Sequence, residues 1–225
     1  MSKTVFFFGA DAPYAKRIIN DLVAKGFYVY AAASDEAALA GIKGDNISTV
    51  VVDPLCQDSL NAAAEKVEKL DMVVLNFQKD FDAGTFGKGL NYDVMLSAYD
   101  YQTLSPLRAL KALLPKLHKG DLKRICYITN EMASNNLTMD ANDFAAHMTL
   151  APIDMQAKTL FNHLRPEGFS FRLYARSLAV QDGSADGYAA EHFTRDLSYD
   201  ADEDYMHNDE NRIVLRDYRA RELPW

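Results

Sequence analysis

Residues 4–26 read T-V-F-F-F-G-A-D-A-P-Y-A-K-R-I-I-N-D-L-V-A-K-G, and the rest of the chain repeats their pattern. The stretch opens with an apolar run, Val5 to Phe8, of the kind found in strands that are buried on both faces. Gly9 then allows a tight turn, and five apolar residues follow at helical spacing: Ala15, Ile18, Ile19, Leu22 and Val23. Gly26 is the expected end of this helix. The stretch therefore predicts a strand, a glycine turn and a helix, which together form the first half of a βαβ unit.

The composition fits one α/β domain that occupies residues 1–225. The chain has 225 residues, of which 48% are hydrophobic, and this is enough for a sizeable core. Its formal net charge of −8 argues against binding to nucleic acid or to an anionic membrane. No apolar run is long enough for a signal peptide or a membrane span, so we expect a cytoplasmic protein. The two cysteines and five histidines show no metal-ligand spacing, and no metal site is expected.

Strands and helices alternate along the whole chain. Seven strands are predicted, at residues 5–8, 26–31, 47–52, 71–76, 124–129, 169–174 and 212–217. After the first helix, further helices are predicted at residues 35–42, 58–70, 92–117, 153–164 and 186–198, and a polar loop at 78–89. This alternation predicts a doubly wound, mostly parallel seven-stranded sheet of the Rossmann-like kind, in three α/β/α layers. Ligands of such sheets bind in the crevice at the carboxyl ends of the strands.

Prolines set the expected limits of the two long helices. Pro106 should bend the helix at 92–117 or mark its effective start. Pro152 indicates that the later helix begins near Ala151.

The order and spacing of several residues resemble the short-chain dehydrogenases/reductases over nearly the whole chain. Gly9 matches the first glycine of the family's T-G-x-x-x-G-x-G turn, and Asp53 matches the aspartate that contacts adenine. Asn76 falls in the segment that corresponds to N-N-A-G in the family. The resemblance implies that NAD or NADP is a possible cofactor. It implies eight candidate cofactor-binding residues: Gly9, Asp11, Tyr14, Ser34, Asp53, Pro54, Asn76 and Phe77.

The glycine turn departs from the family pattern. Pro13 stands at the second glycine, where it adds a ring and removes an N–H donor, and Ala15 replaces the third glycine. Asp11 adds a negative charge where phosphates would lie. A simpler structural interpretation makes Asp11 the N-cap and Pro13 a first-turn residue of the helix. The end of the second strand, at Ser34, carries neither an acidic residue for a ribose hydroxyl nor an arginine for a 2′-phosphate, so the choice between NAD and NADP stays open.

The catalytic positions of the family are also changed. The family uses a Tyr-x-x-x-Lys pair with a serine and an asparagine. At these positions this chain has Ala146 for tyrosine, Leu150 for lysine, Asn130 for serine and Gln102 for asparagine. No tyrosine of the chain is followed by a lysine four residues later, so a shift of register does not restore the pair. Asn130, His147 and Tyr127 are the remaining candidates for catalysis.

Two functions stay open on this evidence. The first is a degenerate, non-enzymatic member of the family that senses a small molecule or acts as a scaffold, with weak or no dinucleotide binding. The second is an atypical NAD(P)-dependent oxidoreductase that acts on a small carbonyl or alcohol substrate with non-standard residues. The fold alone does not decide between them.

Contacts between subunits are expected by the same resemblance. Family members associate through two long helices, here 92–117 and 153–164, so the resemblance implies a homodimer or tetramer. Met148, Leu150 and Met155 lie off the stripe that faces the core, and they are predicted to form that interface. The acidic segment at 196–210 is expected to be solvated or to become ordered against a partner. Trp225 is expected to pack on a neighbouring element or subunit.

Overall fold

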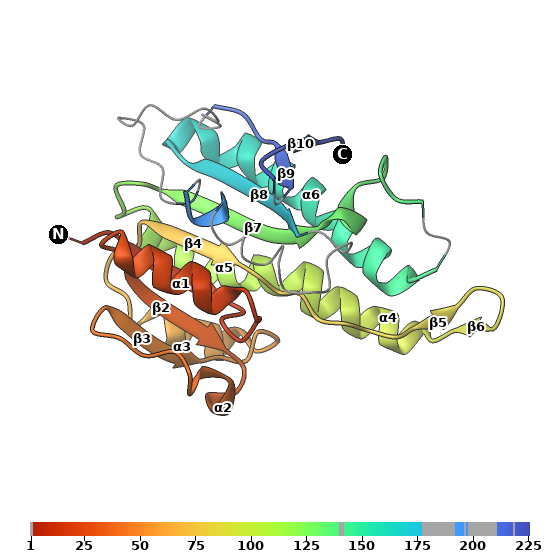
Figure 1. The fold of residues 1–225 in the computed structure, drawn as a ribbon, viewed down its shortest axis with the longest axis horizontal. Helices are drawn as coiled ribbons and strands as arrows, with labels where there is room; N and C mark the ends of the chain where they lie inside the picture. The colour runs from red at the N-terminus through yellow and green to blue at the C-terminus, as the bar shows by residue number, and fades with distance from the viewer. Residues whose placement is uncertain (1, 140–141, 177–191, 196, 198–210, 218) are drawn as a thin grey trace.

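The computed structural model describes residues 2–139, 142–176, 192–195, 197, 211–217 and 219–225. Its centre is a sheet of eight strands in the order β10-β9-β8-β7-β4-β1-β2-β3 (Figure 1). The strands are β1 (Thr4–Phe8), β2 (Tyr28–Ala33), β3 (Ile47–Val51), β4 (Met72–Leu75), β7 (Arg124–Asn130), β8 (Ser170–Arg176), β9 (Leu215–Asp217) and β10 (Glu222–Leu223). All neighbouring strands are parallel except β10, which runs antiparallel to β9. The predicted fold class is confirmed.

The predicted number of strands, seven, was wrong by one. The additional strand is β10, which spans only Glu222–Leu223 and pairs with β9 through a short turn. Two residues are too few to show the alternation or the apolar run by which a strand is predicted from sequence.

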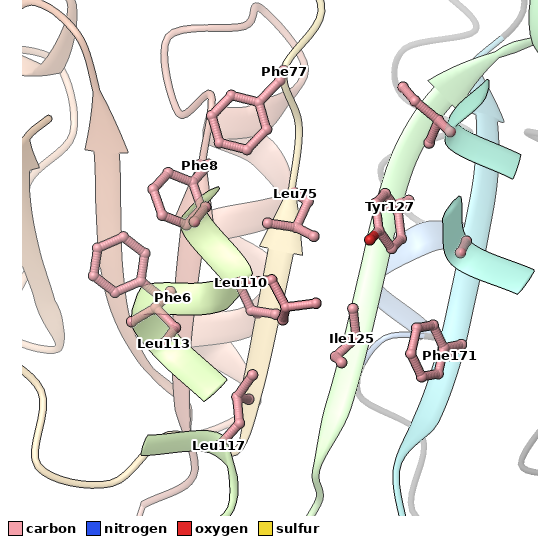
Figure 2. Close-up of a cluster of buried hydrophobic side chains, with 14 of the residues drawn as sticks. Phe6, Phe8, Leu75, Phe77, Leu110, Leu113, Leu117, Ile125, Tyr127 and Phe171 are labelled. Atoms are coloured by element: carbon pink, nitrogen blue, oxygen red, sulfur yellow. The ribbon is translucent and has the colours of Figure 1, made fainter. Parts of the chain in front are cut away.

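Helices cover both faces of the sheet (Figure 1). On one face lie α1 (Ala15–Ala24) and α2 (Glu36–Leu39), and on the other lie α3 (Gln57–Ala64), α5 (Ser105–Leu117) and α6 (Phe144–Leu164). Strand side chains point to the two faces in turn. In β1, for example, Phe6 and Phe8 belong to the core under α3, α5 and α6, whereas Val5 and Phe7 belong to the core under α1. Figure 2 shows the first of these cores, in which Phe8 packs against Phe77 with ring centroids 5.1 Å apart.

The predicted helix at 92–117 is continuous but not uniform. It consists of α4 (Tyr92–Ala98), a π-helical stretch at Tyr99–Leu104 and α5. Pro106 lies in the first turn of α5, so it marks the start of that helix as expected. The predicted loop at 78–89 contains a small hairpin, β5 (Gly84–Thr85) paired with β6 (Gly89–Leu90).

The start of the second long helix was predicted wrongly. We expected the helix at 153–164 to begin near Ala151, but α6 begins at Phe144 and contains Pro152 in its interior. Proline removes only one helical hydrogen bond, and packing on both sides of it compensates for that loss. Ala145, Thr149 and Leu150 are all buried on the turns before Pro152. The helix predicted at 58–70, by contrast, is shorter in the structure, because α3 ends at Ala64.

Parts of the C-terminal predictions lie outside the described residues. This holds for residues 186–191, 196 and 198 of the predicted helix and for nearly all of the acidic segment 196–210; residues 192–195 and 197 are helical. Within the described part of the chain, no helix is both long and apolar enough to cross a membrane.

Candidate functional site

The carboxyl ends of β1 and β4 meet at the point where the order of the strands reverses, and the chain is closely packed there. Gly9 has a φ of +67°, and a Cβ atom at this position would lie 2.0 Å from the carbonyl oxygen of Asn76. The side chain of Asn76 donates from Nδ2 to the Gly9 carbonyl at 3.0 Å and accepts at Oδ1 from the Tyr14 hydroxyl at 2.7 Å. We call these three residues the Gly9 corner. Only glycine fits at position 9, because both the conformation and the space exclude a side chain.

The turn after Gly9 has few free backbone donors. The N–H of Ala10 donates to Ala32 at 3.0 Å, that of Ala12 to Gly9 at 3.2 Å and that of Ala15 to Ala12 at 2.9 Å. Pro13 has no N–H. Four of the six backbone nitrogens from residue 10 to residue 15 are therefore not available to an anion. A diphosphate at this turn would therefore find fewer N–H donors than a phosphate-binding turn ordinarily provides.

The N-cap interpretation of Asp11 was wrong. Helix α1 begins at Ala15, its N-cap residue is Tyr14, and no side chain caps it. The turns closed by Ala12 and Ala15 delay the helix, so that Asp11 lies four residues before its start and Pro13 lies outside its first turn. Asp11 is exposed. Burial, and to a smaller extent the charge of Asp11, raise the pKa of Tyr101.

The remaining candidate cofactor residues make mainly local contacts. Asp53 accepts at Oδ1 from the N–H of Leu55 at 2.9 Å, so its carboxylate holds its own turn. Ser34 is exposed at the end of β2, while Pro54 and Phe77 are buried. The eight predicted residues thus divide into the Gly9 corner, two exposed polar groups at the ends of β2 and β3, and buried or turn residues.

A cavity of about 400 Å³ lies at the carboxyl edge of the sheet, and we call it the strand-end cavity. It is lined by Gln102, Asn130, Ala146 and Leu150, which are the four residues that the family resemblance aligned with catalytic positions. The amide of Gln102 donates to the Lys79 carbonyl at 2.5 Å and accepts from the Thr149 hydroxyl, and Asn130 Oδ1 accepts from the N–H of Met132 at 2.8 Å. These four side chains include no group that exchanges protons near neutral pH.

Charged groups reach the strand-end cavity from two other segments. Lys79, Asp80 and Asp82 come from the loop that leads to β5, and Asp143 precedes α6 with a φ of +53°. The Lys79 ammonium lies 5.7 Å from the ring centre of Phe81 and 5.8 Å from that of Tyr101. With three carboxylates and one ammonium, the cavity favours a polar ligand that is neutral or cationic. The sequence did not assign these four residues to the site, although it predicted a polar loop at this edge.

The other two catalytic candidates lie elsewhere. Tyr127 is buried in the core and donates to Gln156 Oε1 at 3.0 Å, and burial raises its pKa, so it is not placed to exchange protons in the cleft. His147 lines a separate cavity of about 470 Å³, together with Glu131, Met132 and Arg221 among others. Its Nδ1 lies 3.2 Å from the Met132 carbonyl oxygen. Asn130, His147 and Tyr127 therefore do not form one constellation. Among the residues that the structure describes, no group of three or more histidine, cysteine or acidic side chains could hold a metal ion.

Two curated proteins illustrate the sequence similarity of the chain. The chain is 27% identical over 195 residues to 1-hydroxy-2-glutathionyl-2-methyl-3-butene dehydrogenase of Rhodococcus sp. strain AD45, a match that covers 84% of this chain and 83% of that protein. It is 34% identical over 80 residues to C-signal of Myxococcus xanthus, which is 36% of this chain. This second match spans only about half of its relative, 48%. No family model matches the sequence.

Solved structures share the fold at low sequence identity. A short-chain dehydrogenase of Burkholderia cenocepacia in complex with NADP superposes with a TM-score of 0.73 at 14% identity, covering 93% of this chain and 90% of that one. A short-chain oxidoreductase of Pseudomonas aeruginosa, described as containing an atypical catalytic centre, gives a TM-score of 0.68 at 16% identity and covers 78% and 69%.

Proposed function

We infer the function from a premise that the fold and the sequence relatives supply together: the chain belongs to the short-chain dehydrogenase/reductase superfamily. We propose that it binds a small polar molecule in the strand-end cavity as a sensor or scaffold and does not reduce carbonyls by the usual chemistry of that superfamily. Fold alone does not decide this, so the proposal is argued from the site.

One observation carries the proposal. The residues at the four catalytic positions of the superfamily surround a single cavity, but they are Gln102, Asn130, Ala146 and Leu150. A positioned acid or base contributes a rate factor of about 10²–10⁴, and here both that residue and the lysine that would tune its pKa are replaced by aliphatic side chains. The amide groups of Gln102 and Asn130 still offer hydrogen bonds to a ligand.

Dinucleotide binding is proposed to be weak or absent. The turn after Gly9 lacks donors for a diphosphate, and the Asp11 carboxylate adds repulsion. If NAD or NADP does bind, Gly9, Ser34 and Asp53 are the residues that lie where the superfamily contacts it.

A thermal shift assay with NADH and NADPH, combined with a turnover assay on a panel of small carbonyl and alcohol compounds, tests the proposal. Saturation at about 100 times the Kd would stabilise the protein by about 2.7 kcal/mol, which raises the melting temperature by roughly 5–10 °C for a domain of this size. We expect shifts well below this at millimolar cofactor and no turnover. A full shift together with turnover of any panel compound would overturn the proposal.

The alternative function is an atypical NAD(P)-dependent oxidoreductase for a small carbonyl or alcohol substrate. Two observations favour it: charged side chains at the strand-end cavity, Lys79 and Asp143 among them, and a structural neighbour described as having an atypical catalytic centre. Lys79→Met and Asp143→Asn separate the two functions. On the alternative, one of these variants abolishes turnover while leaving the cofactor shift unchanged.

We further propose that the chain forms a homodimer or tetramer. Tyr92, Leu96, Met148 and Met155 expose between 56% and 70% of their surface on α4 and α6. Large exposed apolar groups that lie on neighbouring helices are typical of an interface. Leu150, which we had also assigned to that face, is buried in the core, so this part of the prediction was wrong.

A further inference from the structure

Asn130 is nearly buried in the lining of the strand-end cavity, and it keeps one hydrogen-bonding group without a partner. The residue is 9% exposed, and its Oδ1 atom accepts the N–H of Met132 at 2.8 Å. Its Nδ2 atom has no partner among the described residues and stays in contact with solvent. Both carboxyl oxygens of Asp154, on α6, are in contrast sealed from solvent, so burial acts on the pKa of this group but no ligand reaches it. The amide of Asn130 is therefore suited to donate to a ligand oxygen, because an unpaired donor in a nearly buried position costs free energy.

The charged side chains that line the same cavity are exposed and do not pair with one another; they are Lys79, Asp80, Asp82 and Asp143. None of the ion pairs in the described part of the chain involves any of them. The Lys79 ammonium lies beside the rings of Phe81 and Tyr101 instead. Asp143 stands at the N-cap position of α6, yet its carboxylate makes no capping hydrogen bond. Charges of both signs are thus available to a ligand at one cavity.

Apolar side chains complete the lining. Ala146 and Leu150 stand where the superfamily has its tyrosine and lysine, and Met132 contributes a third apolar group. The volume of about 400 Å³ is suited to a small molecule. We propose that the strand-end cavity binds a small aliphatic amino acid in its zwitterionic form. This inference rests on the function proposed above, because it names the ligand class of the same site.

Each end of an amino acid meets its own set of groups. The ligand carboxylate accepts from Asn130 Nδ2 and pairs with the Lys79 ammonium, while the ligand ammonium pairs with Asp143 and Asp80. Charge-assisted hydrogen bonds of this kind are about twice as strong as neutral ones. A simple cation leaves Asn130 and Lys79 without an acceptor, and a simple anion meets three carboxylates with nothing to offset the repulsion. The zwitterion is the small species that satisfies both sets.

Isothermal titration calorimetry of the full chain with L-alanine, L-valine and L-leucine tests the proposal. The amino acid that binds most tightly is compared with its own amine and acid analogues, which for L-valine are isobutylamine and isovalerate. We expect the amino acid to bind about tenfold or more tightly than either analogue, since each analogue loses one charge-assisted contact.

Two variants address the two ends of the ligand separately. Asn130→Asp keeps an oxygen for the N–H of Met132 but replaces the donor by a carboxylate, so it should weaken amino-acid binding by about tenfold or more and strengthen binding of the amine. A variant that had merely lost its fold could not bind one ligand more tightly. Asp143→Asn should weaken binding of both the amino acid and the amine. Asp58, an exposed acid of α3 outside the cavity lining, provides the matched control, and Asp58→Asn should leave all affinities unchanged.

Four results would overturn the proposal: no binding of any of the three amino acids, equal binding of an analogue, unchanged amino-acid binding in Asn130→Asp, or an effect of Asp58→Asn as large as that of Asp143→Asn. The function proposed above fails on a different measurement, namely a full cofactor shift together with turnover, so the two failures are distinguishable.

Discussion

At the scale of single residues, Gly9 shows how closely two loops approach each other. An alanine at this position would need a backbone conformation with φ of +67° and a shift of the Asn76 carbonyl group. We expect Gly9→Ala to lower the free energy of unfolding by roughly 2–4 kcal/mol, since strain and displacement add. Urea denaturation measures this effect. Gly87 has open space around its Cβ position, so Gly87→Ala should change stability by no more than about 0.5 kcal/mol. Equal effects of the two substitutions would contradict the packing described for the Gly9 corner.

Asp154 predicts a pH dependence of stability. Its pKa is about 7 in the folded protein and near 3.8 in a solvated carboxyl group, so the folded state keeps a proton that the unfolded state has lost. Relative to Asp154→Asn, the wild-type free energy of unfolding should therefore fall as the pH rises from about 4 to about 7, by up to roughly 4 kcal/mol, and should be level above that range. Urea denaturation at a series of pH values provides the measurement. Asp58→Asn should follow the wild-type curve, and parallel curves for wild type and Asp154→Asn would rule out a raised pKa.

At the scale of elements, we propose that the turn between β1 and α1 limits the binding of phosphates in the cleft. The double substitution of Asp11→Ser and Pro13→Gly removes a negative charge and returns one N–H donor to this turn. We expect the melting-temperature shift produced by NADPH to be larger in this variant than in the wild type. Asp11 is exposed and Pro13 lies outside the helix, so the loss of stability without ligand should be limited to about 1 kcal/mol, from the greater freedom of glycine in the unfolded chain. An unchanged shift would mean that the turn is not what limits dinucleotide binding.

Elements differ in how well their sequences predict them. The central strands were predicted because each is an apolar run buried on both faces, as in β1 and β4. Such a run is visible in the sequence itself and does not depend on contacts with distant residues. The start of α6 was missed because Pro152 is a local stop signal, whereas the helix is held by distant contacts such as the hydrogen bond from the Thr149 hydroxyl to Gln102. Tertiary contacts of this kind do not appear in a local pattern.

The candidate site was predicted only in part. The strand ends follow from the alternation of strands and helices, and the four residues at catalytic positions follow from the family resemblance. These four residues do surround one cavity. Asp154 was missed, although it interrupts the stripe formed by Leu150, Ala157 and Phe161 with the same three- and four-residue spacing. An acidic residue in such a stripe is the signal that could have identified it. A cavity of about 370 Å³ is lined by both Asp154 and Trp225, which are 71 positions apart in the chain, and no local pattern connects the two.

At the scale of the whole molecule, the prediction concerns its assembly. Light scattering at micromolar concentration should give a mass of two or four times the 25.2 kDa of one chain. Leu96→Glu combined with Met148→Glu places charges on the exposed faces of α4 and α6, and it should shift the protein toward the monomer. Leu55 is 47% exposed in the turn after β3 and belongs to neither of these helices, so Leu55→Glu should leave the mass unchanged. A monomeric wild type would exclude the proposed interface.

The amide of Asn76 contributes its oxygen to Tyr14 and its nitrogen to Gly9, at the point where the winding of the sheet changes direction. These two hydrogen bonds within the chain thus hold the crossover between β1 and β4 together. The protein should keep this junction intact through purification and storage with no nucleotide added, and a nucleotide that bound there would lose little free energy in ordering a loop that is already held in place.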